Sequence, residues 1–414
     1  MDERIIDADN HYYEAEDAFQ RYGDDSVRGF VRWIQEGKKR RLMFGDQVSF
    51  EPPNPTFNPV ARPGIYHVRL KELHDAEGRG AAASDASSSS TATVSQLSYS
   101  KDVYGELQPL PDAYHDRTAR LAVMDEQGVE RCFLFPTLGS SVEGQFRSNI
   151  VMAHKAFHAF NEWLDEDWGF AYRERIYAPP YIPLADPTMA VEELDFALDR
   201  GARIVSVRPG PAAGRSPADP VWDPFWARVD EAGVVVAYHA TGGPDDYGVA
   251  FESLWGRQPI TDYRYHLTLR RALASDRAVL DTMIALVLGN MFGRFPNVRV
   301  ASIENGCGWV DYCLHALDHA GGLIERHIEA FGTTVDDRPS DIFKEKVWVS
   351  PFPEEDVVGL TGLIGVDRVI FGSDWPHPEG TVAPADYAEC IQKLHPADVQ
   401  KIMRTNALSL LSPP

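Results

Sequence analysis

The sequence is poor in cysteine: only four occur among 414 residues, and none forms a C-x-x-C pair. We therefore expect no thiolate zinc site and interpret the four as small buried apolar residues. No apolar run approaches the ~18 residues of a membrane span. The opening Met-Asp-Glu-Arg has neither the basic region nor the apolar stretch of a secretory leader. These features favour a cytoplasmic protein.

Basic residues are also scarce, since 40 Lys and Arg stand against 62 Asp and Glu, for a formal net charge of −22. Such an excess of negative charge repels phosphate backbones and anionic lipids, so we expect neither a nucleic-acid partner nor membrane binding. No G-x-G-x-x-G or P-loop follows an expected strand, and no G-x-S-x-G is present. These absences argue against nucleotide-binding folds and against a serine nucleophile.

Short β-branched, apolar runs alternate with longer amphipathic segments, which is typical of βα units around a parallel sheet. Apolar residues at Val191, Leu194 and Leu198, after Asp186-Pro187, predict one of the helices. Eight such repeats predict an α/β fold of the (β/α)8 TIM-like barrel type, with an open doubly wound sheet as the alternative. The eight expected strands are Arg4–Asp9, Arg131–Pro136, Ile176–Pro183, Ile204–Arg208, Val234–His239, Arg299–Ile303, Lys346–Ser350 and Arg368–Gly372.

The chain exceeds the ~250 residues typical of such a barrel. We interpret residues 1–414 as a single barrel domain with two insertions, at about 16–115 after strand 1 and about 241–277 after strand 5. Both insertions leave from C-terminal strand ends, which form the catalytic face of a barrel. We therefore expect them to cap the site, with simple surface decoration as the alternative.

The first insertion has structure of its own in this interpretation. Gly45-Asp46 is expected to form a tight turn between two of its strands. The serine-rich tract Ala81–Ser98 predicts a mobile loop near the site entrance. The short antiparallel strands expected here are Val31–Ile34, Arg41–Phe44 and Gln47–Phe50.

Ionisable residues gather at the end of the first expected strand. Asp7, Asp9 and His11 alternate along it, with Glu14 just beyond. Side chains at every second position of a strand share a face, so we expect Asp7, Asp9 and His11 to point the same way.

Three further strand ends carry similar residues. The fifth strand ends at His239, the sixth at Glu304 and the eighth at Asp374, with His377 three residues later. Converging carboxylates repel one another unless a cation lies among them, and imidazole with carboxylate suits Zn, Mn or Fe. Each residue alone could be a core histidine or a helix cap. Together, in strand order, they predict a metal site.

These segments resemble the amidohydrolase-related group of metal-dependent barrels, which includes the aminocarboxymuconate-semialdehyde-type decarboxylases. The resemblance runs nearly end to end. It is carried by Ile6-Asp7-Ala8-Asp9-Asn10-His11, Leu134-Phe135-Pro136-Thr137, Gly201-Ala202-Arg203, Val207-Arg208-Pro209-Gly210, Glu304-Asn305-Gly306-Cys307-Gly308-Trp309, Phe371-Gly372-Ser373-Asp374-Trp375-Pro376-His377 and Arg404-Thr405-Asn406-Ala407.

The resemblance implies a distorted barrel with metal at its C-terminal mouth. The family's first-strand H-x-H corresponds to Asp9-Asn10-His11, so Asp9 takes a place usually held by histidine while His11 keeps its ligand role. His239 matches the strand-five histidine ligand. Asp374 matches the strand-eight aspartate, which binds metal and can act as a general base.

Glu304 stands where decarboxylase-type members often carry a catalytic histidine, and this departure argues against decarboxylase chemistry. With Asp9, Asp374 and Glu14 it gives three or four carboxylates against two or three imidazoles. That balance is closer to carboxylate-bridged di-iron centres, and a small set of amidohydrolase-related proteins are dinuclear iron or mixed-metal hydroxylases.

The ligand set therefore favours a dinuclear non-heme iron monooxygenase. It would hydroxylate a bulky apolar substrate, which could be a carboxylate or a thioester. Its cofactor would be two Fe, with Mn or Zn as alternatives, and its second substrate would be O₂. The alternative is a mononuclear metal-dependent hydrolase, which activates water, or a non-oxidative decarboxylase. A third hypothesis, a non-enzymatic binding barrel, would be favoured by a lack of metal uptake.

Catalytic roles are expected for Asp374, for His377 as ligand or proton carrier, and for Arg208 at the end of strand four. Arg208 could hold a substrate carboxylate, phosphate or thioester carbonyl, with a structural ion pair as the alternative. We expect a small-molecule substrate and, from the resemblance, a homodimer at most. The aromatic residues that could wall an apolar pocket are Trp255, Trp309, Trp348, Trp375 and Tyr238.

Overall fold

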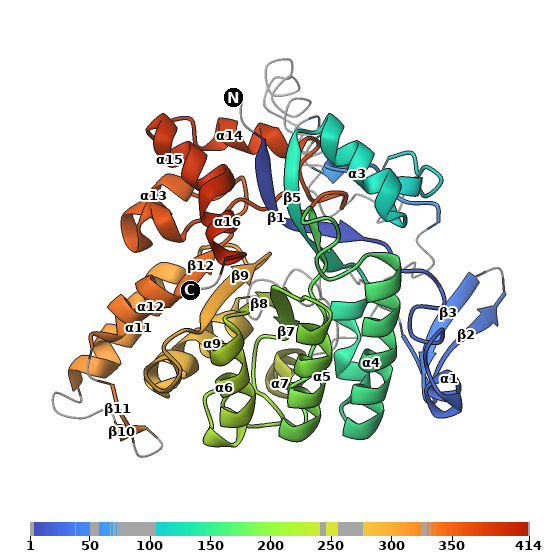
Figure 1. The fold of residues 1–414 in the computed structure, drawn as a ribbon, viewed down its shortest axis with the longest axis horizontal. Coiled ribbons are helices and arrows are strands. Elements are labelled where there is room, and N and C mark those ends of the chain that lie inside the picture. The colour runs from blue at the N-terminus through green and yellow to red at the C-terminus, as the bar shows by residue number, and fades with distance from the viewer. Residues whose placement is uncertain are drawn as a thin grey trace, which may run out of the picture.

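The computed structural model describes residues 4–37, 39–49, 58–66, 68, 72, 105–240, 246–255, 276–323, 329–330, 333–335 and 337–412. The serine-rich tract Ala81–Ser98 and most of the second insertion lie outside these residues. Parallel strands occupy the middle of the molecule and helices surround them (Figure 1). The α/β class expected from the sequence is confirmed.

Seven parallel strands form two sheets, of order β1-β5-β6 and β12-β9-β8-β7. They coincide with seven of the eight expected strands, although the third is only two residues long. Isolated parallel bridges link the sheets, from Tyr181 to Ser206 at one junction. The strands are β1 Ile5–Tyr12, β5 Val129–Pro136, β6 Ile176–Tyr177, β7 Ile204–Val207, β8 Val235–His239, β9 Arg299–Ile303 and β12 Val347–Val349.

The eighth expected strand, Arg368–Gly372, is not a regular strand. Its residues meet their neighbours only through single contacts: Ile370 N–H donates to Val349 O at 3.0 Å, and Ala8 N–H donates to Phe371 O at 2.9 Å. The segment therefore fills the space between β12 and β1 without a continuous ladder. The described strands make two bridged sheets rather than one unbroken ring.

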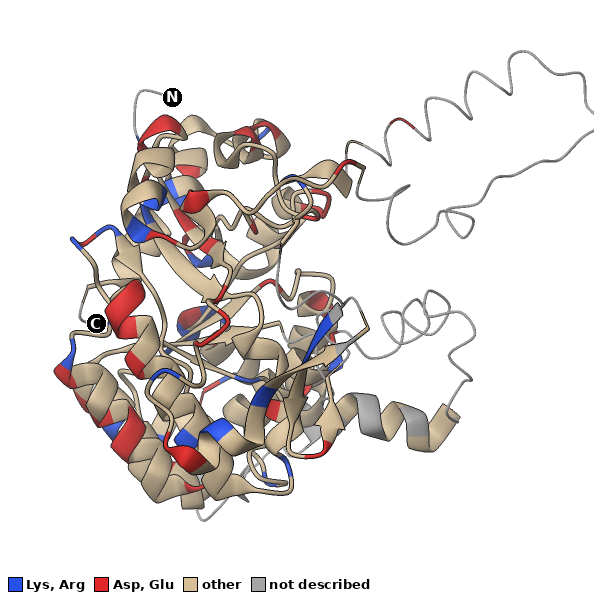
Figure 2. Ribbon diagram, turned by 90° about the vertical axis from the view of Figure 1, so that its right-hand side faces the viewer, with Lys and Arg blue, Asp and Glu red and all other residues tan. Residues whose placement is uncertain are grey.

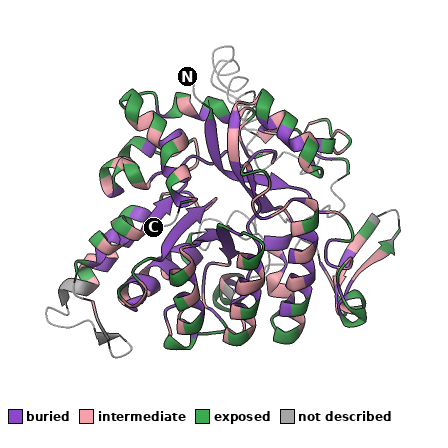
Figure 3. Cartoon of the chain, in the orientation of Figure 1, coloured by how far each residue is buried: buried purple, intermediate pink, exposed green. Residues whose placement is uncertain are grey.

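The helices between the strands bury their apolar faces and expose their polar ones (Figure 3). In α5, Asp186 caps the N-terminus, Pro187 takes the first position, and Leu194 is fully buried, as the sequence predicts. The helices are α1 Asp25–Phe30, α3 Arg117–Glu126, α4 Ile150–Asp167, α5 Pro187–Asp199, α6 Asp223–Ala232, α7 Asp246–Trp255, α9 Arg277–Leu288, α10 Met291–Arg294, α11 Val310–Leu323, α12 Pro339–Lys346, α13 Val357–Ile364, α14 Tyr387–Cys390, α15 Pro396–Gln400 and α16 Asn406–Leu410.

Two apolar clusters make up the core. The outer cluster lies between strands and helices, and the inner one is enclosed by the strands. On β8 the inner residues are Val235 and Ala237, so alternation directs His239, the last residue of the strand, to the inner side as well. The inner cluster includes Ile6, Ala8, Phe133, Phe135, Ile204, Val235, Ala237, Ala301, Ile303 and Ile370.

The first insertion contains the expected antiparallel sheet, formed by β2 (Val31–Glu36), β3 (Lys39–Phe44) and β4 (Gln47–Val48). Gly45, with a φ of 58°, begins the tight turn between the last two strands. This sheet stands at one side of the molecule, beside α1 (Figure 1). Its role as part of a cap stays a prediction.

Charged residues of both signs are spread over the helices and loops (Figure 2). None of the helices in the described ranges combines the length and the apolar character needed to span a bilayer.

Candidate metal centre

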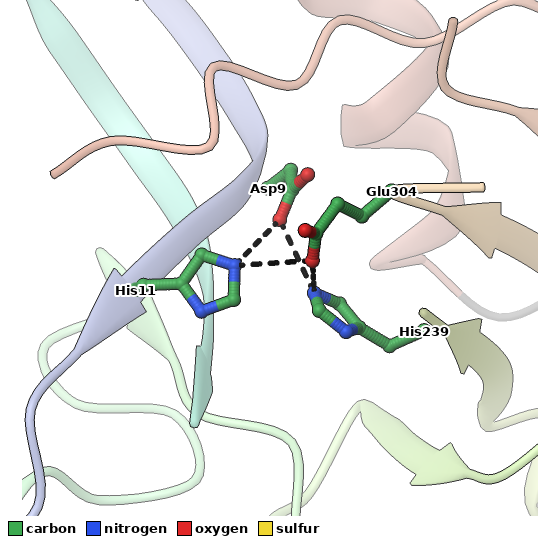
Figure 4. Close-up of side chains that lie close together, drawn as sticks. All are labelled: Asp9, His11, His239 and Glu304. Atoms are coloured by element: carbon green, nitrogen blue, oxygen red, sulfur yellow. Dashed lines mark ion pairs between the residues drawn. The ribbon is translucent and has the colours of Figure 1, made fainter. Parts of the chain in front are cut away.

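The end of β1 carries two candidate ligands and a β-bulge. Asp7 of β1 pairs with Cys132 of β5, and Asn10 pairs with Leu134, so an advance of three residues along β1 matches an advance of only two along β5. A bulge changes which side chains share a face. Asp9 and His11 point into the centre (Figure 4), whereas Asp7 accepts a hydrogen bond from Asn10 Nδ2 at 2.9 Å in the outer core. The expectation that Asp7 shares a side with Asp9 and His11 is therefore wrong, because strict alternation ends at the bulge.

Four donor atoms from β1, β8 and the turn after β9 converge on one point (Figure 4). His11 Nε2 lies 3.3 Å from Asp9 Oδ1 and 3.7 Å from Glu304 Oε2. His239 Nε2 lies 3.5 Å from Asp9 Oδ1 and 3.0 Å from Glu304 Oε2. Ligand atoms bound to one cation at about 2.0–2.2 Å lie about 3–4 Å apart. The four donors therefore have the spacing of a single ion's coordination shell.

Main-chain carbonyls behind the two imidazoles fix their orientation. His11 Nδ1 lies 3.3 Å from Pro136 O, and His239 Nδ1 lies 2.8 Å from Ala240 O. A carbonyl can only accept, so each Nδ1 carries a hydrogen, and Nε2 is the atom that could offer a lone pair to a cation at the centre. This is the arrangement found behind metal-bound histidines.

The centre also satisfies a test of fit for a cation. Asp9 Oδ1, His11 Nε2 and His239 Nε2 are buried, and none of the three has a hydrogen-bond partner. Buried polar atoms in proteins are almost always paired, so three such atoms facing one point require an explanation. A donor set of two imidazoles and two carboxylates suits a divalent metal such as Mn, Fe or Zn.

Electrostatics at the centre point the same way. Burial raises the pKa of Glu304 well above its usual range, and the nearby Asp374 raises it further. Burial also raises the pKa of Asp374, with Glu379 and Asp9 adding to the effect. Burial and His377 lower the pKa of His11 to about 3. A divalent cation would reverse the carboxylate shifts, because it stabilises the anions that burial disfavours.

His377 connects a second set of residues to the centre. His377 Nδ1 lies 2.6 Å from Asp374 Oδ1, and Nε2 lies 3.0 Å from the Thr137 hydroxyl. That hydroxyl donates to Tyr12 O at 2.7 Å, so it accepts from Nε2–H of His377. One further proton must therefore lie between His377 Nδ1 and Asp374 Oδ1. Asp374 Oδ1 is itself 3.3 Å from His11 Nε2, at the edge of the four-donor set.

Glu304 and Asp374 both occupy the left-handed backbone region, with φ of 56° and 55°. Non-glycine residues held there by their surroundings cluster at functional sites. At Glu304 the turn is fastened by Glu355, whose carboxylate accepts from the N–H groups of Cys307, Gly308 and Phe352 at 2.8–3.0 Å. Glu355, which the sequence did not indicate, thus ties the loops after β9 and β12 together.

Arg208 follows β7, one position beyond the pair that joins Val207 to Tyr238 of β8. Its place in the ladder is therefore beside His239. Its Nε lies 3.6 Å from Glu143 Oε2, and that carboxylate accepts the Tyr181 hydroxyl at 2.5 Å. Glu143 and Tyr181 were not singled out from the sequence, because neither stands at the end of a regular strand.

Not every candidate joins the four-donor set. Glu14 is buried and uses Oε1 to accept from Leu138 N–H and Gly139 N–H, both at 2.8 Å. It is not among the grouped donors of the described residues, and its ligand role stays a prediction. The aromatic wall also stays a prediction. Trp309, Trp348, Trp375 and Tyr238 are buried in the core clusters and Trp255 is 59% exposed.

Comparison with known proteins identifies relatives that cover from 70% to 100% of the chain. Residues 6–412 match the amidohydrolase family. An amidohydrolase from Mycobacterium avium subsp. paratuberculosis K-10 is 37% identical, with a TM-score of 0.83 over 100% of both chains. Gamma-resorcylate decarboxylase from Rhizobium sp. (strain MTP-10005) is 25% identical over 70% of this chain and 85% of its own. Dihydroxybenzoic acid decarboxylase from Polaromonas sp. JS666, solved with bound manganese, has a TM-score of 0.54 at 19% identity over 71% and 85%.

These relatives overturn the expected reaction. The curated proteins that match are gamma-resorcylate decarboxylases and a 2-amino-3-carboxymuconate-6-semialdehyde decarboxylase. The expectation of a dinuclear iron monooxygenase is therefore wrong, and two Fe and O₂ lose their support with it. The physical reason is visible in the geometry. The count of carboxylates along the chain includes Glu14, which is not among the grouped donors of the described residues, and the four-donor set has the spacing of one ion's shell. His11, Asp374 and His377 form a second group that overlaps it at His11.

Proposed function

The chain belongs to the amidohydrolase family. We propose that it is a mononuclear divalent-metal enzyme that removes a carboxylate group from a small organic acid without oxidation. The observation that carries this proposal is the set of buried donor atoms from Asp9, His11 and His239 that form no hydrogen bond, which Glu304 Oε2 completes. The decarboxylases among its relatives support the reaction class.

The exposure of the donors indicates the side from which substrate arrives. The side chains of Asp9, His11 and His239 are at most 3% exposed, whereas that of Glu304 is 22% exposed. We assign the first three as the buried base of the metal site and Glu304 as the donor nearest the substrate. A divalent cation held there would bind and polarise the substrate carboxylate.

Decarboxylation breaks a C–C bond, leaves the electron pair on carbon and requires one proton to form the new C–H bond. We assign storage of that proton to the Asp374–His377 pair, which holds one between Oδ1 and Nδ1 at 2.6 Å. Thr137 keeps the His377 ring in place through Nε2. Arg208, one ladder position beyond Val207 and beside His239, is our assignment for contact with an anionic group of the substrate.

Hydrolysis is the second candidate function, and Glu304 is the observation that favours it. The decarboxylases that this chain resembles often carry histidine at this position, whereas a carboxylate beside a metal-bound water can act as a general base. In this case the same centre would cleave an ester, amide or lactone.

The test uses Mn²⁺-loaded protein under anaerobic conditions with a panel of hydroxylated benzoates. We expect one CO₂ released per substrate consumed, and loss of turnover in His239→Ala. Hydrolysis of an ester or lactone panel without CO₂ release would transfer the assignment to the second candidate. No turnover with either panel by protein that holds one Mn²⁺ per chain would contradict both.

A further inference from the structure

A buried polar network lies behind β1, on the side away from the metal centre. It consists of Asp7, Asn10, Arg120 and Ser373, all at most 2% exposed. We call this set the β1 network. Arg120 comes from α3, which lies beside β5 and β1 (Figure 1). Buried charged groups need partners throughout, so a set this deep in the core has a specific structural task.

Arg120 holds the main chain that carries His11. Its Nε donates to Ala113 O at 2.7 Å, one terminal nitrogen donates to His11 O at 2.7 Å, and the other donates to Asn10 Oδ1. The guanidinium also lies over the ring of Trp375, 4.7 Å from its centroid. All of these contacts are fixed by planar guanidinium geometry, which lysine cannot reproduce.

Asp7 forms the other half of the network. Its carboxylate accepts from Asn10 Nδ2 at 2.9 Å, from Ser373 N–H at 2.9 Å and from the Ser373 hydroxyl at 2.5 Å. It also lies 3.2 Å from the N–H of Asp9. Asp7 therefore joins the main chain of the ligand Asp9 to Ser373, the residue that precedes Asp374.

The bulge in β1 explains why this network exists. Without the extra residue, Asp7 and Asn10 would fall on opposite faces of the strand. The bulge brings both to the outer face, where Arg120 and Ser373 meet them, and turns Asp9 and His11 inward. Bulges beside active sites commonly re-aim side chains in this way.

We propose that Arg120, Asn10, Asp7 and Ser373 are positioning residues that hold the β1 bulge and thereby aim Asp9 and His11 at a single metal ion. The inference rests on the metal site of the proposed function but not on its reaction. The network contacts the ligands through their main chain, so its loss leaves every donor side chain present and disturbs only their geometry.

The test compares Mn²⁺ binding by the wild-type chain and by Arg120→Met, which keeps an apolar stem but removes the guanidinium. Free and bound Mn²⁺ are measured by electron paramagnetic resonance, which also records the shape of the bound signal. Loss of residues that orient metal ligands typically weakens affinity about 10- to 100-fold. We expect a loss in this range together with an altered bound signal.

Arg117→Met is the matched control. Arg117 lies on the same helix, donates to Glu166 O at 2.9 Å and covers the ring of Tyr172. Neither contact involves a residue of the β1 network. Its Mn²⁺ affinity should stay within about twofold of wild type. If Arg117→Met weakens binding as much as Arg120→Met, the effect is a general one of α3 and the proposal is wrong.

Ser373→Ala keeps the test decisive if Arg120→Met does not fold. It removes only the hydroxyl that donates to Asp7, and we expect a severalfold weaker Mn²⁺ affinity. Folded variants with wild-type affinity and signal would overturn the positioning role while leaving the proposed function intact. A wild-type chain that binds no Mn²⁺ would instead overturn the proposed function and this inference with it.

Discussion

His239 lies beside both carboxylates of the four-donor set, with its Nε2 3.5 Å from Asp9 Oδ1 and 3.0 Å from Glu304 Oε2. Replacing it by alanine removes one imidazole ligand and leaves the cation under-coordinated. We expect His239→Ala to bind Mn²⁺ at least about 100-fold more weakly than wild type. Mutation of residues that only hydrogen-bond to metal ligands already lowers metal affinity about 10- to 100-fold.

Titration calorimetry with MnCl₂ measures this difference. His315→Ala is the control, because His315 is exposed on α11 and should leave binding unchanged. Wild-type affinity in His239→Ala would remove this residue from the centre.

Glu14 gives a pH-dependent prediction. Burial raises its pKa from the ordinary 4.5 to about 7, despite the two backbone N–H groups that bind it. The folded chain therefore holds this proton more tightly than the unfolded chain, and its stability falls as pH rises from 4.5 through 7. The loss attributable to Glu14 is on the order of 3 kcal/mol.

Glu14→Gln keeps an oxygen for the two N–H groups but cannot ionise. The free energy of unfolding in urea at pH 5 and pH 8 should therefore fall less in this variant than in wild type. Equal pH slopes for the two proteins would show that Glu14 ionises normally in the folded chain.

Individual ligands could be predicted from the sequence because each combines an ionisable side chain with the end of an apolar strand. Asp9, His11, His239 and Glu304 all converge as this reasoning requires. The direction of Asp7 could not be predicted, since no residue type reports a one-residue bulge. A weak signal for Arg120 was available: it stands four residues before Met124, within the buried stripe of α3.

At the scale of elements, the turn after β9 decides where Glu304 lies. Gly306 in this turn has a φ of 62°, and a Cβ there would come within 2.9 Å of both Glu355 Oε1 and the Phe352 ring. Gly306→Ala should cost about 1–2 kcal/mol for left-handed backbone and about 1–3 kcal/mol for the overlap.

Gly128→Ala separates these two costs, because Gly128 has a φ of 70° and open space around its Cβ position. Urea unfolding should show the smaller, backbone cost alone in Gly128→Ala. Weaker Mn²⁺ binding is expected only in Gly306→Ala. Equal destabilisation of the two variants would contradict the close packing assigned to the Glu355 turn.

Regular elements were predictable where periodicity and capping agree, as in α5 with its Asp186 cap and buried Leu194. The eighth strand was not, although its sequence is apolar. Ser373 N–H and Asp374 N–H both turn back to Asp9 O, and the left-handed Asp374 ends the extended backbone. Tertiary contacts with β1 override the local preference for a strand there.

For the whole molecule, metal binding should be coupled to stability. Burial and mutual repulsion disfavour ionised Glu304 and Asp374, and a bound cation removes this cost. Mn²⁺ at a hundredfold excess over its Kd should stabilise the chain by about 2.7 kcal/mol, provided that it binds only the folded state.

This stabilisation should raise the Tm by several degrees in thermal unfolding of the chelator-treated protein. His239→Ala should show no such rise at the same Mn²⁺ concentration. A Tm that Mn²⁺ does not change in the wild-type chain would mean that the folded state holds no ion.

The family and the α/β class could be predicted for the whole molecule, because the motifs that carry them extend from Ile6 to Ala407. The reaction could not. Whether carboxylates gather around one ion or two depends on distances between strand ends, and the count of acidic residues along the chain does not contain those distances. Glu14 illustrates the difference, since its Oε1 accepts from two backbone N–H groups and it is not among the grouped donors of the described residues.

One divalent ion is expected to bind between Asp9, His11, His239 and Glu304. Anomalous X-ray diffraction from a crystal of the Mn²⁺-loaded protein tests it most directly. We predict a single strong peak per chain, about 2.0–2.3 Å from Asp9 Oδ1, His11 Nε2 and His239 Nε2. Two peaks within the centre, or a peak that these residues do not contact, would show that this set does not hold a single ion.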